Sequence, residues 1–169
     1  MKTLKPVLFS ILLLILNYAN AYSTTKNDAN NILNAYYELK NALVKGTATT
    51  VNAKAKDLIT ALTSFSATQL TAKEKAAWSK YADKLQFDAR HISESADIAH
   101  QREHFASLSL NMFEVVKSLK FNTAVVYRQY CPMKKSYWLS ESSAIENPYY
   151  GNQMLTCGEV KETLNPSGK

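Results

Sequence analysis

Residues 98–119 read IAHQREHFASLSLNMFEVVKSL, and this stretch decides the fold class that the sequence predicts. Its mostly apolar side chains recur three and four residues apart, so they would share one face of a helix. That face consists of Ile98, Gln101, Phe105, Leu108, Met112, Val116 and Leu119. Ser95 or Asp97 is expected to cap the first turn. We therefore predict an amphipathic helix that buries this face against other helices.

Three earlier segments carry similar stripes, at residues 28–45, 50–65 and 71–92. We expect Gly46 to end the first of them. Thr71 and Glu74 form a T-x-x-E capping box at the start of the third, in which each side chain satisfies a backbone N–H of the first turn. Four such helices joined by short polar loops bury their stripes most simply side by side. The sequence thus predicts a mainly α protein, with an antiparallel four-helix bundle over residues 22–122.

Residues 123–169 differ in composition, and we expect them to form a small C-terminal turn/β-rich lobe. This Cys/Met lobe would pack on the bundle and make one domain with it. Residues 123–127 are β-branched and aromatic, which predicts a short strand, and residues 159–164 are expected to form a final strand. The segment between them holds both cysteines and two of the four methionines. Its prolines and glycines are typical of turns.

The first 21 residues, MKTLKPVLFSILLLILNYANA, have the layout of a secretory signal peptide. Two lysines precede an apolar run, and Ala19 and Ala21 are small residues suited to a cleavage site. The apolar run is about half of the roughly 20 residues that a membrane span needs. We therefore expect an exported, periplasmic protein with no membrane span after the signal is cleaved.

Composition argues against several function classes. Only four glycines occur, and neither a dinucleotide-binding fingerprint nor a phosphate-binding loop is present. The net charge of +6 is mild and its lysines and arginines are scattered, so we expect no nucleic-acid partner. A cysteine nucleophile paired with histidine would need an orienting acid and an oxyanion hole, and neither is evident. The sequence therefore does not predict an enzyme.

Four sulfur-bearing residues are candidate metal ligands: Cys131, Met133, Met154 and Cys157. Side chains two apart in an extended segment point the same way, so Cys131 and Met133 can face one point. If the intervening turns bring residues 131–133 and 154–157 together, two thiolates and two thioethers converge. Soft sulfur ligands select Cu(I), with silver as its mimic, whereas zinc seldom takes methionine. Trp138 lies between these two segments in the sequence and is expected to shield such an ion.

The cysteines also allow a simpler interpretation. Two cysteines in an exported protein usually form one disulfide. A Cys131–Cys157 bond would close a loop of about 25 residues and add about 3 kcal/mol of stability. Met133 and Met154 would then be ordinary fillers of gaps in the core. From spacing alone, both interpretations remain open.

The three histidines, His91, His100 and His104, form a second group of candidate ligands. His100 and His104 are four residues apart and would lie on one face of the fourth helix. His91 is near the end of the third helix, at the same end of the bundle. All three are therefore expected to approach one another near the 93–97 turn. The alternative is that they are surface or boundary histidines with no ligand.

Several C-terminal motifs resemble a bacterial exported domain of unknown function, of the DUF3347 type. They are YCPM at residues 130–133, YWLS at 137–140, IENPYYG at 145–151 and MLTCG at 154–158. His91 and the segment DIAHQREHF at residues 97–105 resemble the helical part of the same domain. This domain occurs alone or at the end of periplasmic adaptor subunits of copper/silver efflux pumps.

The resemblance implies a helical bundle with a metal-handling C-terminal lobe, and it favours metal binding over a simple disulfide. Carried over by position, the metal ligands are Cys131, Met133, Met154 and Cys157, with His91, His100 and His104 as additions. One departure is that lysines occupy positions 134 and 135, where small residues are expected. We predict a heavy-metal-binding protein for Cu(I) that acts as a buffer or carrier, with a periplasmic efflux adaptor as partner. The alternative is a non-enzymatic interaction module stapled by a disulfide.

Overall fold

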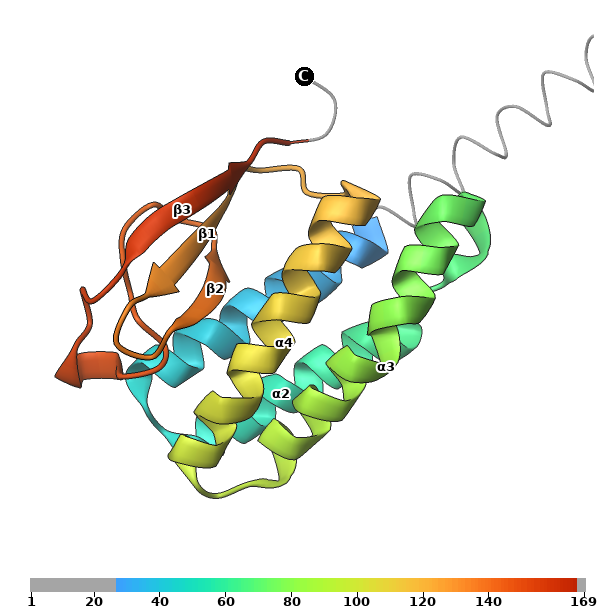
Figure 1. Ribbon diagram of the computed structural model, residues 1–169. Coiled ribbons are helices and arrows are strands. Elements are labelled where there is room, and N and C mark those ends of the chain that lie inside the picture. The colour runs from blue at the N-terminus through green and yellow to red at the C-terminus, as the bar shows by residue number, and fades with distance from the viewer. Residues whose placement is uncertain (1–26, 167–169) are drawn as a thin grey trace, which may run out of the picture.

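The computed structural model describes residues 27–166, which are mainly helical (Figure 1). A first helix covers residues 27–45. It is followed by α2 (Ala48–Ser64), the short 3₁₀ helix η1 (Ala67–Gln69), α3 (Ala72–Glu94) and α4 (Ile98–Leu119). The four predicted helices are confirmed, with ends within about two residues of the expected ones. The expected signal peptide, residues 1–21, lies outside the described residues.

Local capping defines where the last two long helices begin and end. The Thr71 hydroxyl accepts the Glu74 N–H at 3.3 Å, and the Glu74 carboxylate accepts the Thr71 N–H at 2.9 Å, so the predicted capping box is present. Asp97 caps α4 by accepting the Ala99 N–H at 2.9 Å. Lys120 ends α4 in the left-handed conformation, with φ of 48°.

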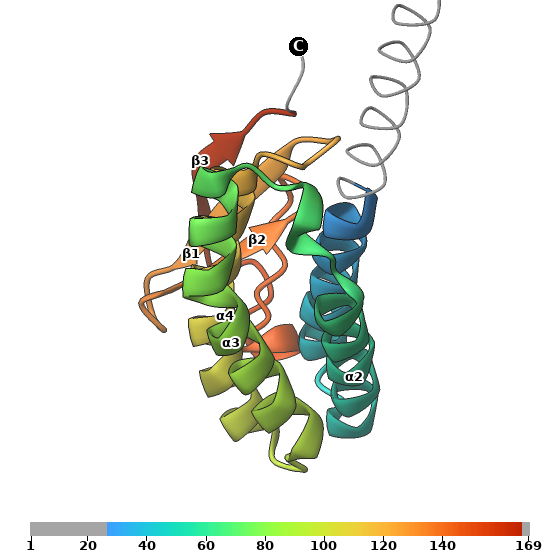
Figure 2. The ribbon, with the colours of Figure 1, turned by 90° about the vertical axis from the view of Figure 1, so that its right-hand side faces the viewer.

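The helices pack side by side with their apolar stripes inward. Helix α3 packs against both α2 and α4. The predicted α4 stripe is buried from Gln101 to Leu119, and Ile98 is half-buried at its start. The sheet lies on the side of α4 that faces away from α3, and Figure 2, viewed from the α3 side, shows the same order of layers.

The C-terminal lobe contains a three-stranded antiparallel sheet of order β2-β1-β3. Its strands are β1 (Val126–Cys131), β2 (Ser136–Ser140) and β3 (Glu159–Leu164), with a second 3₁₀ helix, η2 (Gly151–Gln153), before β3. The final strand is confirmed. The strand expected at residues 123–127 was misplaced, since β1 begins three residues later and extends to Cys131. Strand β2 was not predicted, because its five residues are stabilised by packing rather than by a clear sequence pattern.

One continuous core joins the sheet to the helices. The Tyr36 hydroxyl, on the first helix, lies 2.7 Å from the Ser109 hydroxyl on α4 and accepts the Leu139 N–H of β2 at 3.0 Å. Trp138 and Leu139 of β2 are fully buried. Arg102 on α4 donates to the carbonyls of Pro148 and Leu43 at 2.9 and 3.2 Å. These contacts hold the lobe against the helices and so position the cysteines that it carries.

Candidate metal centres

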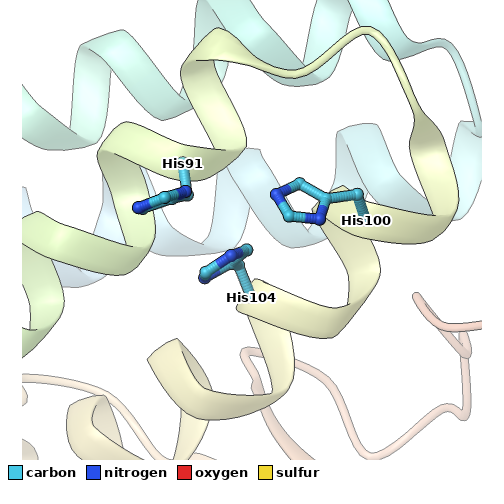
Figure 3. Close-up of side chains that lie close together, drawn as sticks. All are labelled: His91, His100 and His104. Carbon is cyan, nitrogen blue, oxygen red and sulfur yellow. The ribbon is translucent and has the colours of Figure 1, made fainter.

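The three histidines come together between α3 and α4, as the sequence predicted (Figure 3). One nitrogen of each ring belongs to a set whose members all lie within 4.8 Å of one another. The ring centroids of His91 and His104 are 4.5 Å apart with an interplanar angle of 13°, and those of His100 and His104 are 4.7 Å apart. All three side chains are half-buried. In the described part of the chain, residues 27–166, this is the one group of three or more His, Cys, Asp or Glu side chains with ligand atoms so close.

A buried glutamine holds the α3–α4 turn that brings the histidines together. The Gln101 side-chain amide nitrogen lies 2.8 Å from the Ser95 carbonyl and 3.2 Å from the Ile92 carbonyl. It also lies 2.7 Å from the side-chain oxygen of Asn52 on α2. Sequence analysis placed Gln101 on the buried stripe but did not recognise this function. The sequence did contain a signal for this function, since Gln101 is a polar residue in an otherwise apolar stripe.

Asp88 is a further member of the histidine cluster that sequence analysis missed. It is buried on α3, and its carboxylate lies 2.9 Å from Nδ1 of His104. A carboxylate accepts hydrogen bonds, so Nδ1 of His104 carries the proton and donates. The other ring nitrogen, Nε2, is then the one available to a metal ion. The available signal was its position three residues before His91, on the same helix.

The two cysteines lie next to each other at one end of the sheet. Cys131 ends β1 and is buried, whereas Cys157 is half-buried just before β3. Antiparallel pairing places Tyr130 opposite Glu159, so the chain that enters β3 passes Cys131. The two Sγ atoms are 3.9 Å apart and both thiols are free. Both interpretations of the cysteines required these two segments to meet, and the structure brings Cys131 and Cys157 together.

The environment of Cys157 favours its protonated form. Desolvation, together with the adjacent Cys131 sulfur, raises the pKa of Cys157, and the Met133 backbone acts in the opposite direction. The Lys134 N–H lies 3.4 Å from the Cys131 sulfur and donates to it. A metal ion that binds Cys157 must therefore displace its thiol proton.

The two methionines do not fill gaps in the core. Met133 is 63% exposed and Met154 is 36% exposed. The interpretation of these residues as core fillers is therefore wrong. Of the four predicted sulfur ligands, the structure brings the two cysteines together and leaves the two thioethers at the surface of the same lobe.

The turns around Cys157 are held by buried polar and aromatic residues. The Asn147 side chain donates to the Cys157 carbonyl at 2.7 Å, and the Asn147 N–H donates to the Leu155 carbonyl at 2.8 Å. Trp138 packs against Gly158, where an added Cβ would lie 2.8 Å from the indole ring. The indole thus lies beside the residue that follows Cys157. Sequence analysis placed Trp138 near the cysteines but missed the role of Asn147.

The histidines and cysteines form two separate groups. The histidines lie where α3 faces α4, whereas the sheet that carries Cys131 lies on the other side of α4 (Figure 1). The histidine group includes neither cysteine. The expectation that histidines would be added to the sulfur ligands therefore has no counterpart in this arrangement.

Comparison with protein families identifies a family for the helical part of the chain. Residues 32–124 match a family described as a protein of unknown function (DUF3347). The chain belongs to this family. The match covers α2, α3, α4 and most of the first helix and ends before β1, so it includes the three histidines but neither cysteine. Comparison with curated proteins and with solved structures finds no match. In residues 27–166, none of the helices has the length and apolar character that a membrane crossing requires.

Proposed function

We propose that this protein is an exported heavy-metal-binding protein that holds Cu(I) at the cysteine pair of its C-terminal lobe. The observation that supports the proposal is the 3.9 Å separation of the Cys131 and Cys157 sulfur atoms. Two thiolates bound at about 2.3 Å to one ion with tetrahedral geometry lie about 3.8 Å apart. The cysteines thus have the spacing of two ligands of one metal ion.

The choice of Cu(I) rests on the chemistry of the neighbouring side chains. Met133 and Met154 supply two exposed thioethers on the same lobe as the two thiols. Thiolates and thioethers together select a soft ion, so Cu(I) fits best and silver shares its preferences. Zinc fits less well, because its structural sites use four cysteine or histidine ligands.

We propose a buffer or carrier that is linked to metal efflux, rather than an enzyme. Cys157 is half-buried and both methionines are exposed, so an acceptor protein can reach the ligands and exchange with them. The resemblance to domains attached to efflux adaptors suggests such an adaptor as the acceptor. The periplasmic location rests on the signal-like residues 1–21. In this proposal the helices form an antiparallel four-helix bundle that supports the lobe, through contacts such as that between Tyr36 and Leu139.

The two lysines after Met133 bear on the affinity of this site. Lys134 is half-buried and Lys135 is exposed in a left-handed turn, with φ of 55°. Their positive charges oppose a cation, but charges in contact with solvent are screened by salt. We therefore expect Cu(I) affinity to change only weakly when these lysines are replaced.

A competition titration tests the proposal. Reduced, untagged protein is titrated with Cu(I) in the presence of a chromophoric chelator, and one ion per chain is expected to bind. The Met133→Leu, Met154→Leu double variant should bind at least about tenfold more weakly, because it loses two soft ligands. Met112→Leu, the same change in the core of α4, is the matched control and should leave Cu(I) affinity unchanged. Failure of the reduced protein to take up Cu(I) would overturn the proposal.

The same proximity of the sulfur atoms favours a second candidate, an interaction module stapled by a Cys131–Cys157 disulfide. A thiol count on freshly purified protein separates the two. Zero free thiols, together with no Cu(I) uptake after reduction, supports the stapled module. Two free thiols and Cu(I) uptake support the metal-binding protein.

A further inference from the structure

We propose that His91, His100 and His104 form a second metal site, separate from the cysteine pair, for a divalent transition-metal ion such as Zn²⁺ or Cu²⁺. The site uses imidazole nitrogens alone, and such ligands suit these ions better than Cu(I) held by sulfur. The inference does not depend on the proposed function of the cysteines.

The spacing of the ring nitrogens supports the site. Three nitrogens bound at about 2.0–2.1 Å to a tetrahedral ion lie about 3.4 Å apart. In the structure one nitrogen of each ring already belongs to a set whose members all lie within 4.8 Å of one another. The His91 ring is stacked on the His104 ring, so the His91 ring must turn before its lone pair aims at the same point. Rotation about side-chain bonds is enough for this adjustment, because all three side chains are only half-buried.

Asp88 gives the cluster a feature that is common in the metal sites of proteins. Metal-binding histidines commonly donate their second N–H to a carboxylate, which fixes the tautomer and orients the ring. The 2.9 Å contact between the Asp88 carboxylate and Nδ1 of His104 has this form. Burial of a carboxylate also costs less free energy when a positive charge lies nearby. A dication held by His104 supplies that charge.

The fourth position of such an ion would face the surface. Three histidines leave one coordination position of a tetrahedral ion for water or another ligand. Phe87 is 54% exposed beside the cluster, with its ring centroid 4.4 Å from that of His91. It packs beside the His91 and His104 rings, and the cluster remains half-buried. We therefore expect an ion that binds reversibly.

The convergence of the three histidine rings is not explained if they are only boundary residues with no ligand. Asp88 needs one partner, and His104 provides it. That pair gives no reason for His91 and His100 to converge on the same ring from two different helices. A shared ion gives all three the same partner.

Zinc titration of untagged protein tests the inference. We expect one Zn²⁺ per chain in competition with a chromophoric chelator, and a shift of the imidazole signals in the NMR spectrum. The chain has three histidines and all belong to the cluster, so these signals report on this site alone. His100→Gln should weaken Zn²⁺ binding at least about 100-fold, since loss of a ligand exceeds the 10–100-fold cost of losing an outer partner.

Two variants separate a metal site from a structural contact. Asp88→Asn should weaken Zn²⁺ binding about 10–100-fold. Asp83→Asn, the same change at an exposed position of α3, should leave it unchanged. Circular dichroism is the control that checks whether each variant is folded. If Asp88→Asn unfolds the protein, the His100→Gln result decides, because His100 lies at the half-buried start of α4.

The outcome is distinguishable from that of the Cu(I) proposal. Cys157→Ser should leave Zn²⁺ binding intact, and His100→Gln should leave Cu(I) binding intact. The inference is overturned if Zn²⁺ does not bind, if the imidazole signals do not shift, or if binding survives His100→Gln and is lost in Cys157→Ser.

Discussion

The histidine cluster and the cysteine pair are assembled by different means. His100 and His104 share a helix face through their four-residue spacing, and a short turn adds His91. Cys131 and Cys157 are 26 residues apart and meet because two strands of one sheet pair. The first arrangement is largely local, whereas the second depends on long-range pairing. Damage to the lobe should therefore affect the cysteines first, and damage to the α3–α4 turn should affect the histidines first.

The largest expected effect is on the lobe. Trp138→Ala removes a fully buried side chain that packs against Gly158, and it should lower the free energy of unfolding by about 3–5 kcal/mol. Urea denaturation measures this loss. Phe87→Ala removes an exposed aromatic ring beside the histidines and should change stability by less than about 0.5 kcal/mol. Equal effects from the two variants would contradict the contrast between the regions.

The next effect tests the turn that joins α3 to α4. Gln101→Leu removes the buried amide that lies within hydrogen-bond distance of the Ile92 and Ser95 carbonyls. Leaving these carbonyls unsatisfied should cost about 1–3 kcal/mol, measured by thermal or urea unfolding. Zn²⁺ binding should weaken while Cu(I) binding persists. Gln86→Leu, at a half-buried position of α3, is the control, and an equal loss of stability there would argue against this role for Gln101.

A gradual effect, which is small near neutral pH and grows above about pH 10, concerns the junction between the regions. Burial raises the pKa of Tyr36 and of Tyr149 well above the ordinary tyrosine value. The unfolded chain loses these protons near pH 10, but the folded protein keeps them, so folding stability falls as pH rises above about 10. The slope should approach about 1.4 kcal/mol per pH unit for each tyrosine.

Urea unfolding between pH 8 and pH 11 measures this slope. Cys157 has a raised pKa and adds a loss of the same sign at lower pH, so Cys157→Ser serves as the background that isolates the tyrosines. A free energy of unfolding that stays constant up to pH 11 would show that the tyrosine hydroxyls titrate equally in both states.

Prediction from sequence succeeded where spacing along one helix carries the information. The Thr71 capping box, the α4 stripe and the convergence of the histidines near the 93–97 turn all follow from periods of three and four residues. Strand β2 and the position of β1 were harder, because short strands acquire their stability from cross-strand neighbours and burial. Asp88 was missed because its partner His104 lies on another helix, 16 residues later.

The amino-acid sequence by itself determined the helices, their buried faces and the types of ligand available, since these depend on residue identity and local periodicity. The tertiary structure decided which ligands meet. It placed Cys131 beside Cys157 through strand pairing and separated both from the histidines by packing α4 between the sheet and α3. The reason is physical: side-chain periodicity is a property of one element, whereas the distance between elements depends on how the whole core packs.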